Sequence, residues 1–128
     1  MGKEQRRRQV KLPGKPWFDF KLFGLKWRCR IIPRDDAALD KGATLAYCDY
    51  DTRVMGFSDV LTNEQLRTAF VHEVQHAIEE HADVDYEEIH SPEVADRLTD
   101  QVARGWLYVI RECPEIIDFL RDTRPRGA

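Results

Sequence analysis

The segment AFVHEVQHAIEEH, residues 69–81, limits the possible fold of this chain more than any other part of the sequence. It belongs to a longer apolar stripe at helical spacing, the mark of a helix that buries one face. The stripe consists of Leu66, Phe70, Val74, Ala77 and Ile78. Thr62 is a good N-cap, and Gln65 three residues later completes a capping box. We therefore predict an amphipathic helix from about Asn63 to about His81.

The sequence before this helix favours a small β-sheet. Residues 23–32, FGLKWRCRII, alternate well enough to form a strand. The side chains expected on one face of it are Leu25, Trp27, Cys29 and Ile31. Residues 43–57 indicate two further short strands around a turn near residues 49–52.

The sequence after the helix favours more helix. Ser91 followed by Pro92 is typical of a helix start. Pro114 should end or break this second helix, and the apolar residues in 116–120 predict a short final helix folded back on the core. Strands come first and helices after, which predicts an α+β fold: a small N-terminal sheet, the helix over residues 63–81, then a second acidic and apolar helix.

A chain of 128 residues is expected to form one domain. We predict a flexible basic arm over residues 1–16, a single domain over 17–122 and a loose tail over 123–128. The three cysteines form no C-x-x-C pair and are expected to be reduced packing groups, which favours a cytoplasmic location. No apolar run approaches the length needed to span a bilayer, so no membrane contact is expected.

Charge is distributed unevenly along the chain. Residues 1–34 carry 11 Lys/Arg and 2 Asp/Glu, a net charge of +9, whereas residues 35–128 carry −12. The basic end could contact nucleic acid or an acidic partner, mainly through residues 3–15. It could equally be a solubilising tail, or lie on the acidic surface of the protein itself, because no nucleic-acid recognition motif accompanies the charge.

The predicted helix carries the motif His-Glu-x-x-His. His72 and His76 are four residues apart and therefore lie on one helical face. Two imidazoles in this arrangement can bind one Zn²⁺ ion, and Glu73 beside them can act as the general base on a zinc-activated water. The alternative interpretation is two surface histidines and a surface glutamate with no joint role.

The segment FVHEVQHAI, residues 70–78, resembles the active-site helix of the zincin metallopeptidases. The order of a small sheet, this helix and an acidic helix is similar to that of the compact ImmA/IrrE-like and phage-type zinc metallopeptidases. RGWLYVIRECPEI, residues 104–116, resembles the end of a helix in those proteins. The resemblance covers roughly residues 40–120. It implies a zincin-like fold, peptidase activity on an exposed or partly unfolded protein segment, and, for a phage-encoded protein, action in the host cytoplasm.

A catalytic zinc site usually has three protein ligands and an open water position, and the motif supplies two. The metzincins place a third histidine six residues after the second motif histidine, where this chain has Ala82. His81 is one residue out of register, and Glu79 stands where those proteins have glycine. We therefore exclude the metzincin class.

In the zincins whose third ligand is a glutamate, that residue lies on a later helix, and the resemblance implies Asp96 as its counterpart. Ala103 and Leu107 share its side of the helix and indicate a partly buried face. Asp96 is shorter than the usual glutamate, so Glu93 and His90 stay open as alternatives. Asp100 is expected to orient a motif histidine.

Two functions follow from these patterns. The first is a zinc-dependent peptidase with Glu73 as general base. An oxyanion-stabilising group is expected, for which the candidates are His90, Tyr86 and Tyr108. The second is a non-catalytic binding protein stabilised by zinc, whose basic arm contacts nucleic acid or a partner protein. The substitution Glu73→Gln should abolish turnover only in the first case.

Overall fold

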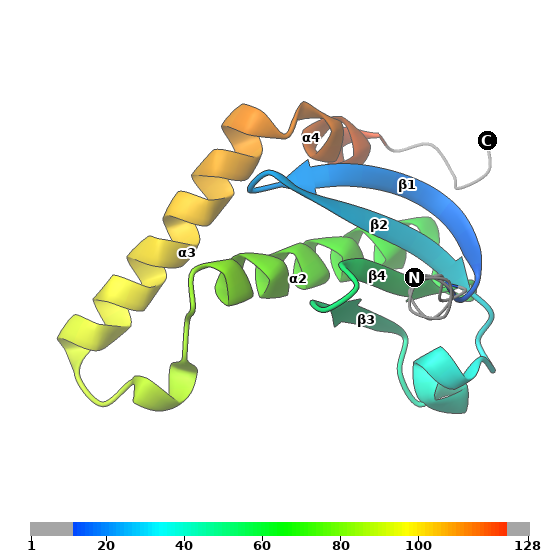
Figure 1. Cartoon of the computed structure of the whole chain (residues 1–128), viewed down its shortest axis with the longest axis horizontal. Coiled ribbons are helices and arrows are strands. Elements are labelled where there is room, and N and C mark those ends of the chain that lie inside the picture. Colours follow the sequence, from blue (N-terminus) through cyan, green and yellow to red (C-terminus); the bar gives the residue numbers. More distant parts are fainter. Residues whose placement is uncertain (1–11, 123–128) are drawn as a thin grey trace, which may run out of the picture.

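The computed structural model describes residues 12–122 and has an α+β fold in which helices pack on a four-stranded mixed sheet (Figure 1). The elements follow one another along the chain as strands β1 (Lys15–Leu22), β2 (Leu25–Ile32), β3 (Ala46–Asp49) and β4 (Val54–Ser58), helices α2 (Asn63–His81), α3 (Pro92–Glu112) and α4 (Pro114–Arg121), and the 3₁₀ turns η1 (Ala37–Gly42) and η2 (Tyr86–Glu88).

The strand order in the sheet is β1-β2-β4-β3. The strands β1 and β2 form an antiparallel hairpin, as do β3 and β4, and the two hairpins join through parallel pairing of β2 with β4. All five residues of β4 are buried between its neighbours. Strand β3 is therefore an edge of the sheet, and it contacts α2.

Helix α2 covers one face of the sheet and has the bounds that the sequence predicts (Figure 1). The Thr62 side chain accepts from the Gln65 backbone N–H, and the Gln65 side chain accepts from the Thr62 N–H, so the predicted capping box is confirmed. The predicted apolar stripe is confirmed as well, because Leu66, Phe70, Val74, Ala77 and Ile78 are all buried.

Helices α3 and α4 complete the fold. Ser91 caps α3, which starts at Pro92 as predicted. The helix ends at Glu112, and Cys113 separates it from α4, which begins at Pro114. Gly105 brings α3 close to α2, since a side chain at this position would collide with Ile78. The final helix folds back on the core as predicted: Ile116 is buried, and Phe119 packs on the aromatic rings of β1 and α2.

Regular structure begins earlier than the sequence predicts. Strand β1 was not expected, and its first two residues, Lys15 and Pro16, fall inside the segment interpreted as an arm. The residues just before β1 are bound as well: the Arg30 guanidinium donates to the backbone carbonyls of Pro13 and Gly14, at 2.9 and 2.8 Å. Residues 1–11 of the predicted arm and the predicted tail, residues 123–128, lie outside the described part of the chain.

Strand β2 differs from expectation in its details. Trp27 and Cys29 are buried as predicted, but Leu25 at the start of the strand is 47% exposed. At the other end Ile32 is fully buried, whereas Ile31 is only half-buried. The alternation predicted from the sequence therefore holds only in the middle of the strand.

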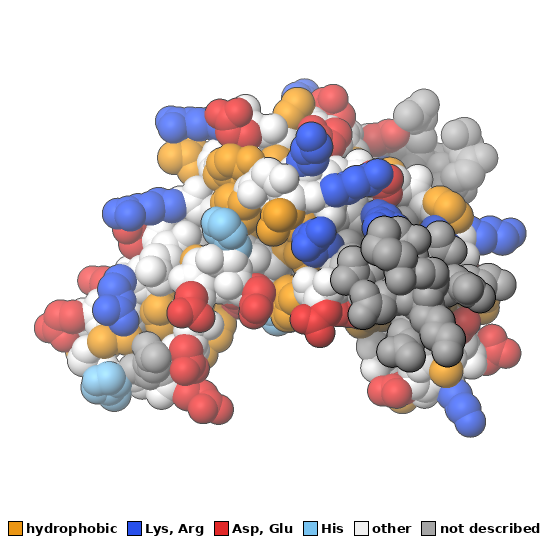
Figure 2. All heavy atoms as spheres, viewed as in Figure 1, with side chains coloured by type: hydrophobic (Ala, Val, Ile, Leu, Met, Phe, Trp, Pro, Cys, Tyr) orange, Lys and Arg blue, Asp and Glu red, His pale blue; other side chains and the backbone are white. Residues whose placement is uncertain are grey.

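The surface of the β1–β2 hairpin is rich in cations. Figure 2 shows several Lys and Arg side chains over this part of the molecule. Those exposed on the two strands are Lys15, Lys21, Lys26 and Arg28. None of the helices within residues 12–122 is long and apolar enough to cross a membrane.

Candidate metal centre

Helix α2 holds the two motif histidines with their ring nitrogens facing each other. His72 Nε2 and His76 Nε2 are 3.0 Å apart, and the two rings stand nearly perpendicular, at 85°. The one-turn spacing places both residues on the side of α2 that is not packed on the sheet, where His72 is exposed and His76 half-buried. Both imidazoles thus present a nitrogen at the same point in solvent-accessible space.

This pair of nitrogens fits a zinc ion. Two imidazole nitrogens at about 2.0–2.1 Å from one tetrahedral zinc lie roughly 3.3 Å apart. The distance between the two Nε2 atoms, 3.0 Å, is close to that value.

His76 also has a carboxylate on its other ring nitrogen. Its Nδ1 lies 3.0 Å from Glu79 Oε1. The other oxygen of that carboxylate, Oε2, accepts from the Tyr86 hydroxyl at 2.6 Å. A carboxylate can only accept, so this contact favours the tautomer of His76 that has its proton at Nδ1 and its lone pair at Nε2.

Glu73, the motif glutamate, is buried although it carries a carboxylate. The residue is 5% exposed and lies on the side of α2 next to β3. Burial raises the pKa of the Glu73 carboxyl, and the charges of His76 and His72 oppose that rise. A carboxylate in this environment accepts a proton more readily than one in water, as a general base must.

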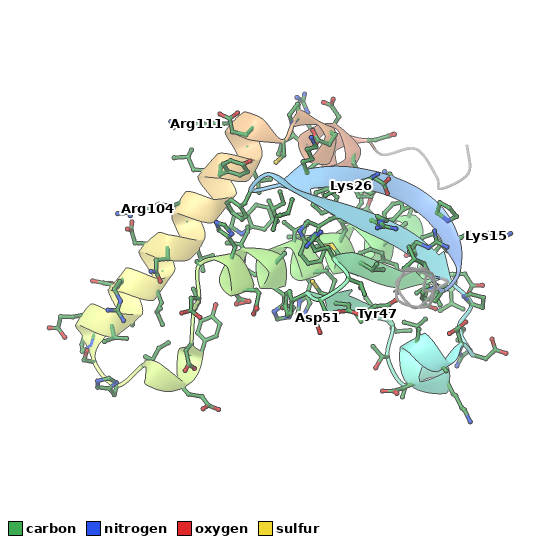
Figure 3. All side chains as sticks on the ribbon, viewed as in Figure 1. Lys15, Lys26, Tyr47, Asp51, Arg104 and Arg111 are labelled. Atoms are coloured by element: carbon green, nitrogen blue, oxygen red, sulfur yellow. The ribbon has the colours of Figure 1, made fainter. Side chains whose placement is uncertain are left out.

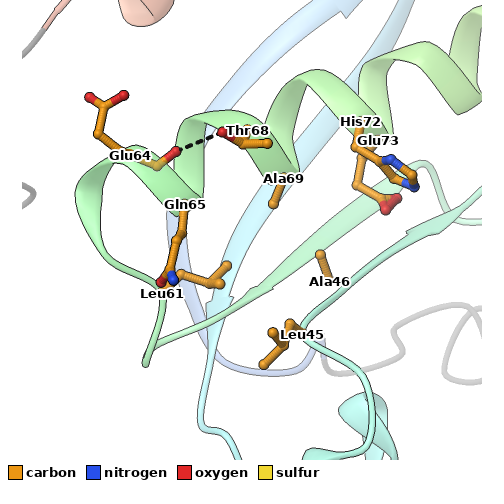
Figure 4. A pocket seen from close by; sticks show the side chains of 9 residues that line it. All are labelled: Leu45, Ala46, Leu61, Glu64, Gln65, Thr68, Ala69, His72 and Glu73. Atoms are coloured by element: carbon orange, nitrogen blue, oxygen red, sulfur yellow. Dashed lines mark hydrogen bonds between the residues drawn. The ribbon is translucent and has the colours of Figure 1, made fainter.

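An open cavity adjoins Glu73 and His72. Its volume is about 560 Å³, and it lies between the first half of α2 and the segment leading into β3 (Figure 4). The residues that line it are Leu45, Ala46, Leu61, Glu64, Gln65, Thr68, Ala69, His72 and Glu73. The floor and the β3 side are apolar, so the cavity can receive an apolar side chain of a ligand held near the histidines.

Two side chains on the β3 side of the site carry no charge near neutral pH. Burial, followed by the negative charge of Glu73, raises the pKa of the Cys48 thiol to about 12. Burial raises the pKa of Tyr50 to about 12 as well, and its hydroxyl donates to the His76 backbone carbonyl at 3.3 Å. Cys48 is therefore a neutral thiol and not a reactive thiolate.

Asp96, predicted as the third ligand, lies on the far side of α3. This helix packs through the face that holds Leu98, Gly105 and Val109, all buried. Asp96 is two residues before Leu98, which corresponds to a rotation of about 200° around the helix axis. Asp96 therefore points away from the face to which Leu98 belongs. Asp96 is exposed, and so are Ala103 and Leu107 on its side of the helix. The expectation of a partly buried face there is wrong.

The other acidic and histidine candidates are also on the surface. Glu93 and His90 are exposed at the start of α3. Asp100 pairs with Arg104 at 2.7 Å on the outer side of that helix, and Figure 3 shows Arg104 pointing away from the body of the molecule. Within residues 12–122, no three His, Cys, Asp or Glu side chains come together as a metal-binding group. The structure thus pairs the His72 and His76 rings, with Glu73 close enough to interact with their charges, and brings none of the predicted third ligands to them.

The sequence-based reasoning missed the contact between Glu79 and His76. The role predicted for Asp100, that of a carboxylate on a motif histidine, is taken at His76 by Glu79. The spacing of three residues on a helix was a usable signal, because side chains three apart are neighbours on its surface. Of the predicted oxyanion donors, Tyr86 binds Glu79, and Tyr108 stacks on Phe23.

Comparisons of the chain with protein-family models, with characterised proteins and with solved structures find no match. The function is therefore inferred from the geometry of the site.

Proposed function

We propose that the protein is a zinc-dependent peptidase in which His72 and His76 bind the metal and Glu73 is the general base. The observation that carries the proposal is the 3.0 Å distance between the two Nε2 atoms, beside a carboxylate that is 5% exposed. In the zinc-free protein the two nitrogens share a hydrogen bond, and that contact holds both rings in the arrangement that one metal ion needs. A buried glutamate next to them also costs free energy that function would explain.

The chemistry divides between the metal and the chain. His72 and His76 would hold the zinc ion, which when bound would supply polarisation of the scissile carbonyl and a coordinated water with its pKa lowered to about 7. Glu73 takes the proton from the attacking water and later transfers it to the leaving amine. Its raised pKa suits both steps, because a carboxyl group with a higher pKa is a stronger base and still a usable acid.

The cavity beside Glu73 supports a peptide substrate. A side chain next to the scissile bond would enter the apolar space lined by Leu45, Leu61 and Ala69. The cavity is open on the solvent side, so an extended or partly unfolded protein segment could reach it, whereas a folded surface would fit poorly. This agrees with the substrate class that the zincin resemblance implies.

A metal analysis combined with one substitution tests the proposal. Protein purified in the presence of zinc should hold about one zinc per chain, and His72→Ala should lose it. Glu73→Gln should retain zinc but hydrolyse an unfolded protein or a peptide library at a rate at least 100-fold lower, the lower end of a general base's contribution. Glu80→Gln, an exposed neighbour in the same helix, is the matched control and should keep full activity.

Two outcomes would contradict the proposal in different ways. A protein that takes up no zinc refutes the metal centre. A protein that holds zinc but shows the same rate for Glu73→Gln and wild type refutes Glu73 as the base.

The second candidate function is a non-catalytic binding protein, and the basic surface of the β1–β2 hairpin favours it. Lys21 and Arg28 are exposed on this hairpin, which follows the basic residues 3–15 in the sequence. An acidic partner or nucleic acid could contact both together, and such binding would weaken steeply with salt. Zinc bound without turnover, together with salt-dependent binding of a nucleic acid, would select this function.

A further inference from the structure

The Glu79 carboxylate is fixed at both of its oxygens. Oε1 contacts His76 Nδ1 at 3.0 Å, and Oε2 accepts from the Tyr86 hydroxyl at 2.6 Å. The Glu79 side chain is only 12% exposed, in contrast to the 44% of His76. An ordinary surface ion pair leaves its carboxylate largely in water, so this carboxylate is held in a defined position by two partners.

We propose that Glu79 is the positioning residue of the metal centre and that Tyr86 sets the orientation of Glu79. The inference rests on the proposed function, because it assigns His76 as a metal ligand through Nε2. Neither residue touches the metal or the substrate in this role. Glu79 acts by holding the His76 proton at Nδ1, which leaves the Nε2 lone pair free for the metal.

The facing histidines make this assignment necessary. Two neutral imidazoles whose Nε2 atoms are 3.0 Å apart need one proton between them, and either ring could carry it. Glu79 removes the ambiguity in the zinc-free protein: with Nδ1 of His76 protonated, its Nε2 accepts, and Nε2 of His72 donates. On metal binding the His72 proton moves through solvent from Nε2 to Nδ1, which leaves both Nε2 lone pairs for the metal. Metal-binding histidines generally have such a partner on the second nitrogen, and it fixes both the tautomer and the ring orientation.

Tyr86 connects this arrangement to the segment between α2 and α3. It is the first residue of η2, a turn that Asp85 caps by accepting from the Glu87 backbone N–H at 2.9 Å. The conformation of this turn therefore decides whether the Tyr86 hydroxyl reaches Glu79. A ligand or partner that moved η2 would release one oxygen of the carboxylate and loosen His76.

The first test is the tautomer of each histidine in zinc-free protein. Nuclear magnetic resonance of the ring nitrogens, at a pH where both rings are neutral, should show His76 protonated at Nδ1 and His72 at Nε2. Glu79→Ala should let His76 populate the Nε2–H form. Glu79→Gln should largely restore the wild-type pattern, since its amide oxygen can still accept from Nδ1. Glu80→Ala, one residue further on, is the control and should change neither ring.

The second test is zinc affinity, measured by competition with a chelator. Glu79→Ala should weaken zinc binding by roughly 10–100-fold, the range typical of a lost partner of a ligand. Glu79→Gln should lose less. Tyr86→Phe, which removes one hydroxyl and no carbon, should also lose less but should differ from wild type.

The outcomes separate this inference from the proposed function. If neither wild type nor any variant binds zinc, the peptidase proposal fails. The tautomers of the histidines in zinc-free protein then still decide the role of Glu79. If wild type binds zinc and Glu79→Ala matches it in both affinity and tautomer, the positioning role is refuted and the metal centre stands. Should Glu79→Ala not fold, the tautomer of wild type still tests Glu79, since His76 protonated at Nε2 refutes its role. Tyr86→Phe then tests the part assigned to Tyr86, which an unchanged affinity refutes.

Discussion

Helix α2 and helix α3 are of similar length, yet the core holds them very differently. Helix α2 buries six residues, among them Phe70 and Val74, and is covered by the strands, α3 and α4. Helix α3 has a clear apolar face as well, but Leu107 and Ile110 remain 43% and 60% exposed, and only three of its residues are buried. An apolar side chain on a helix therefore indicates burial only where another element exists to cover it.

This difference explains why one half of the predicted site is assembled and the other is not. His72, Glu73 and His76 are placed by the burial of their own helix, which fixes the rotation of α2 on the sheet. Asp96 depends on the rotation of α3, and that is set by Gly105 against Ile78. The packed face and the acidic face of α3 point in different directions.

The largest expected effect contrasts the two helices directly. Phe70→Ala should destabilise the protein by about 3–5 kcal/mol, because it removes a fully buried ring from an aromatic cluster and leaves a cavity. Leu107→Ala should cost much less, about 0.5 kcal/mol, since that residue is already 43% exposed. Denaturant unfolding of both variants measures the contrast. Equal losses would mean that α3 is covered in solution.

The next effect tests how closely the two helices approach. Gly105→Ala introduces a methyl group that collides with Ile78 Cγ2, so α3 must shift, at a cost of about 1–3 kcal/mol. Alanine otherwise favours a helix interior over glycine by about 1 kcal/mol. A variant more stable than wild type in thermal melting would therefore show that the helices are less close than described. Arg104→Ala on the exposed side is the control.

A smaller effect depends on pH and concerns Glu73. Its pKa is raised in the folded protein, so the folded state loses stability as the pH rises through that pKa, and the loss is complete at higher pH. Glu73→Gln should therefore be more stable than wild type at pH 7 in zinc-free protein. The difference should vanish below the ordinary glutamate pKa of about 4.3, where the carboxyl is protonated in both states. Melting curves at pH 7 and pH 4 with a chelator test this, and a variant that is less stable at pH 7 contradicts it.

The smallest effect is expected at Asp96. From its exposed position on the outer face of α3, Asp96→Asn should change stability by less than about 0.5 kcal/mol. It should leave zinc affinity unchanged, and so should Glu93→Gln and His90→Ala. Loss of a residue that only supports a ligand weakens zinc binding by roughly 10–100-fold. A loss above roughly 100-fold in one variant would therefore identify that residue as the third ligand. It would also show that α3 turns or moves when metal binds.

Sequence alone predicts those parts of the fold whose signals are local. The capping box at Thr62 and the start at Pro92 each involve a few neighbouring residues, and both are confirmed. Strand β1 was missed because Pro16 and the flanking basic residues are typical of a loop. The alternation of Phe18, Phe20 and Leu22 carried the opposite signal.

The site shows the same division. Helical geometry places His76 one turn after His72. It also places Glu79 next to His76, a contact that the sequence indicates but that was not predicted. The spacing of apolar residues in α3 does not show which way Asp96 points. The helix has apolar residues on more than one side, and the core covers only some of them. Tertiary packing decides that orientation, and packing is not a local property of the sequence.

The join between the two hairpins has a consequence for how the chain folds. Each hairpin pairs residues that are close in sequence, such as Leu22 with Leu25 and Asp49 with Val54, whereas the parallel join pairs Arg28 with Val54, 26 positions later. Distant contacts must first overcome loop-closure entropy, so we expect joining of β2 to β4 to limit the rate.

Ile32→Val at the join should therefore mainly slow refolding, whereas Ile116→Val in α4 should mainly speed unfolding. Stopped-flow measurements that gave the reverse would place α4, rather than the central pair of strands, in the folding nucleus.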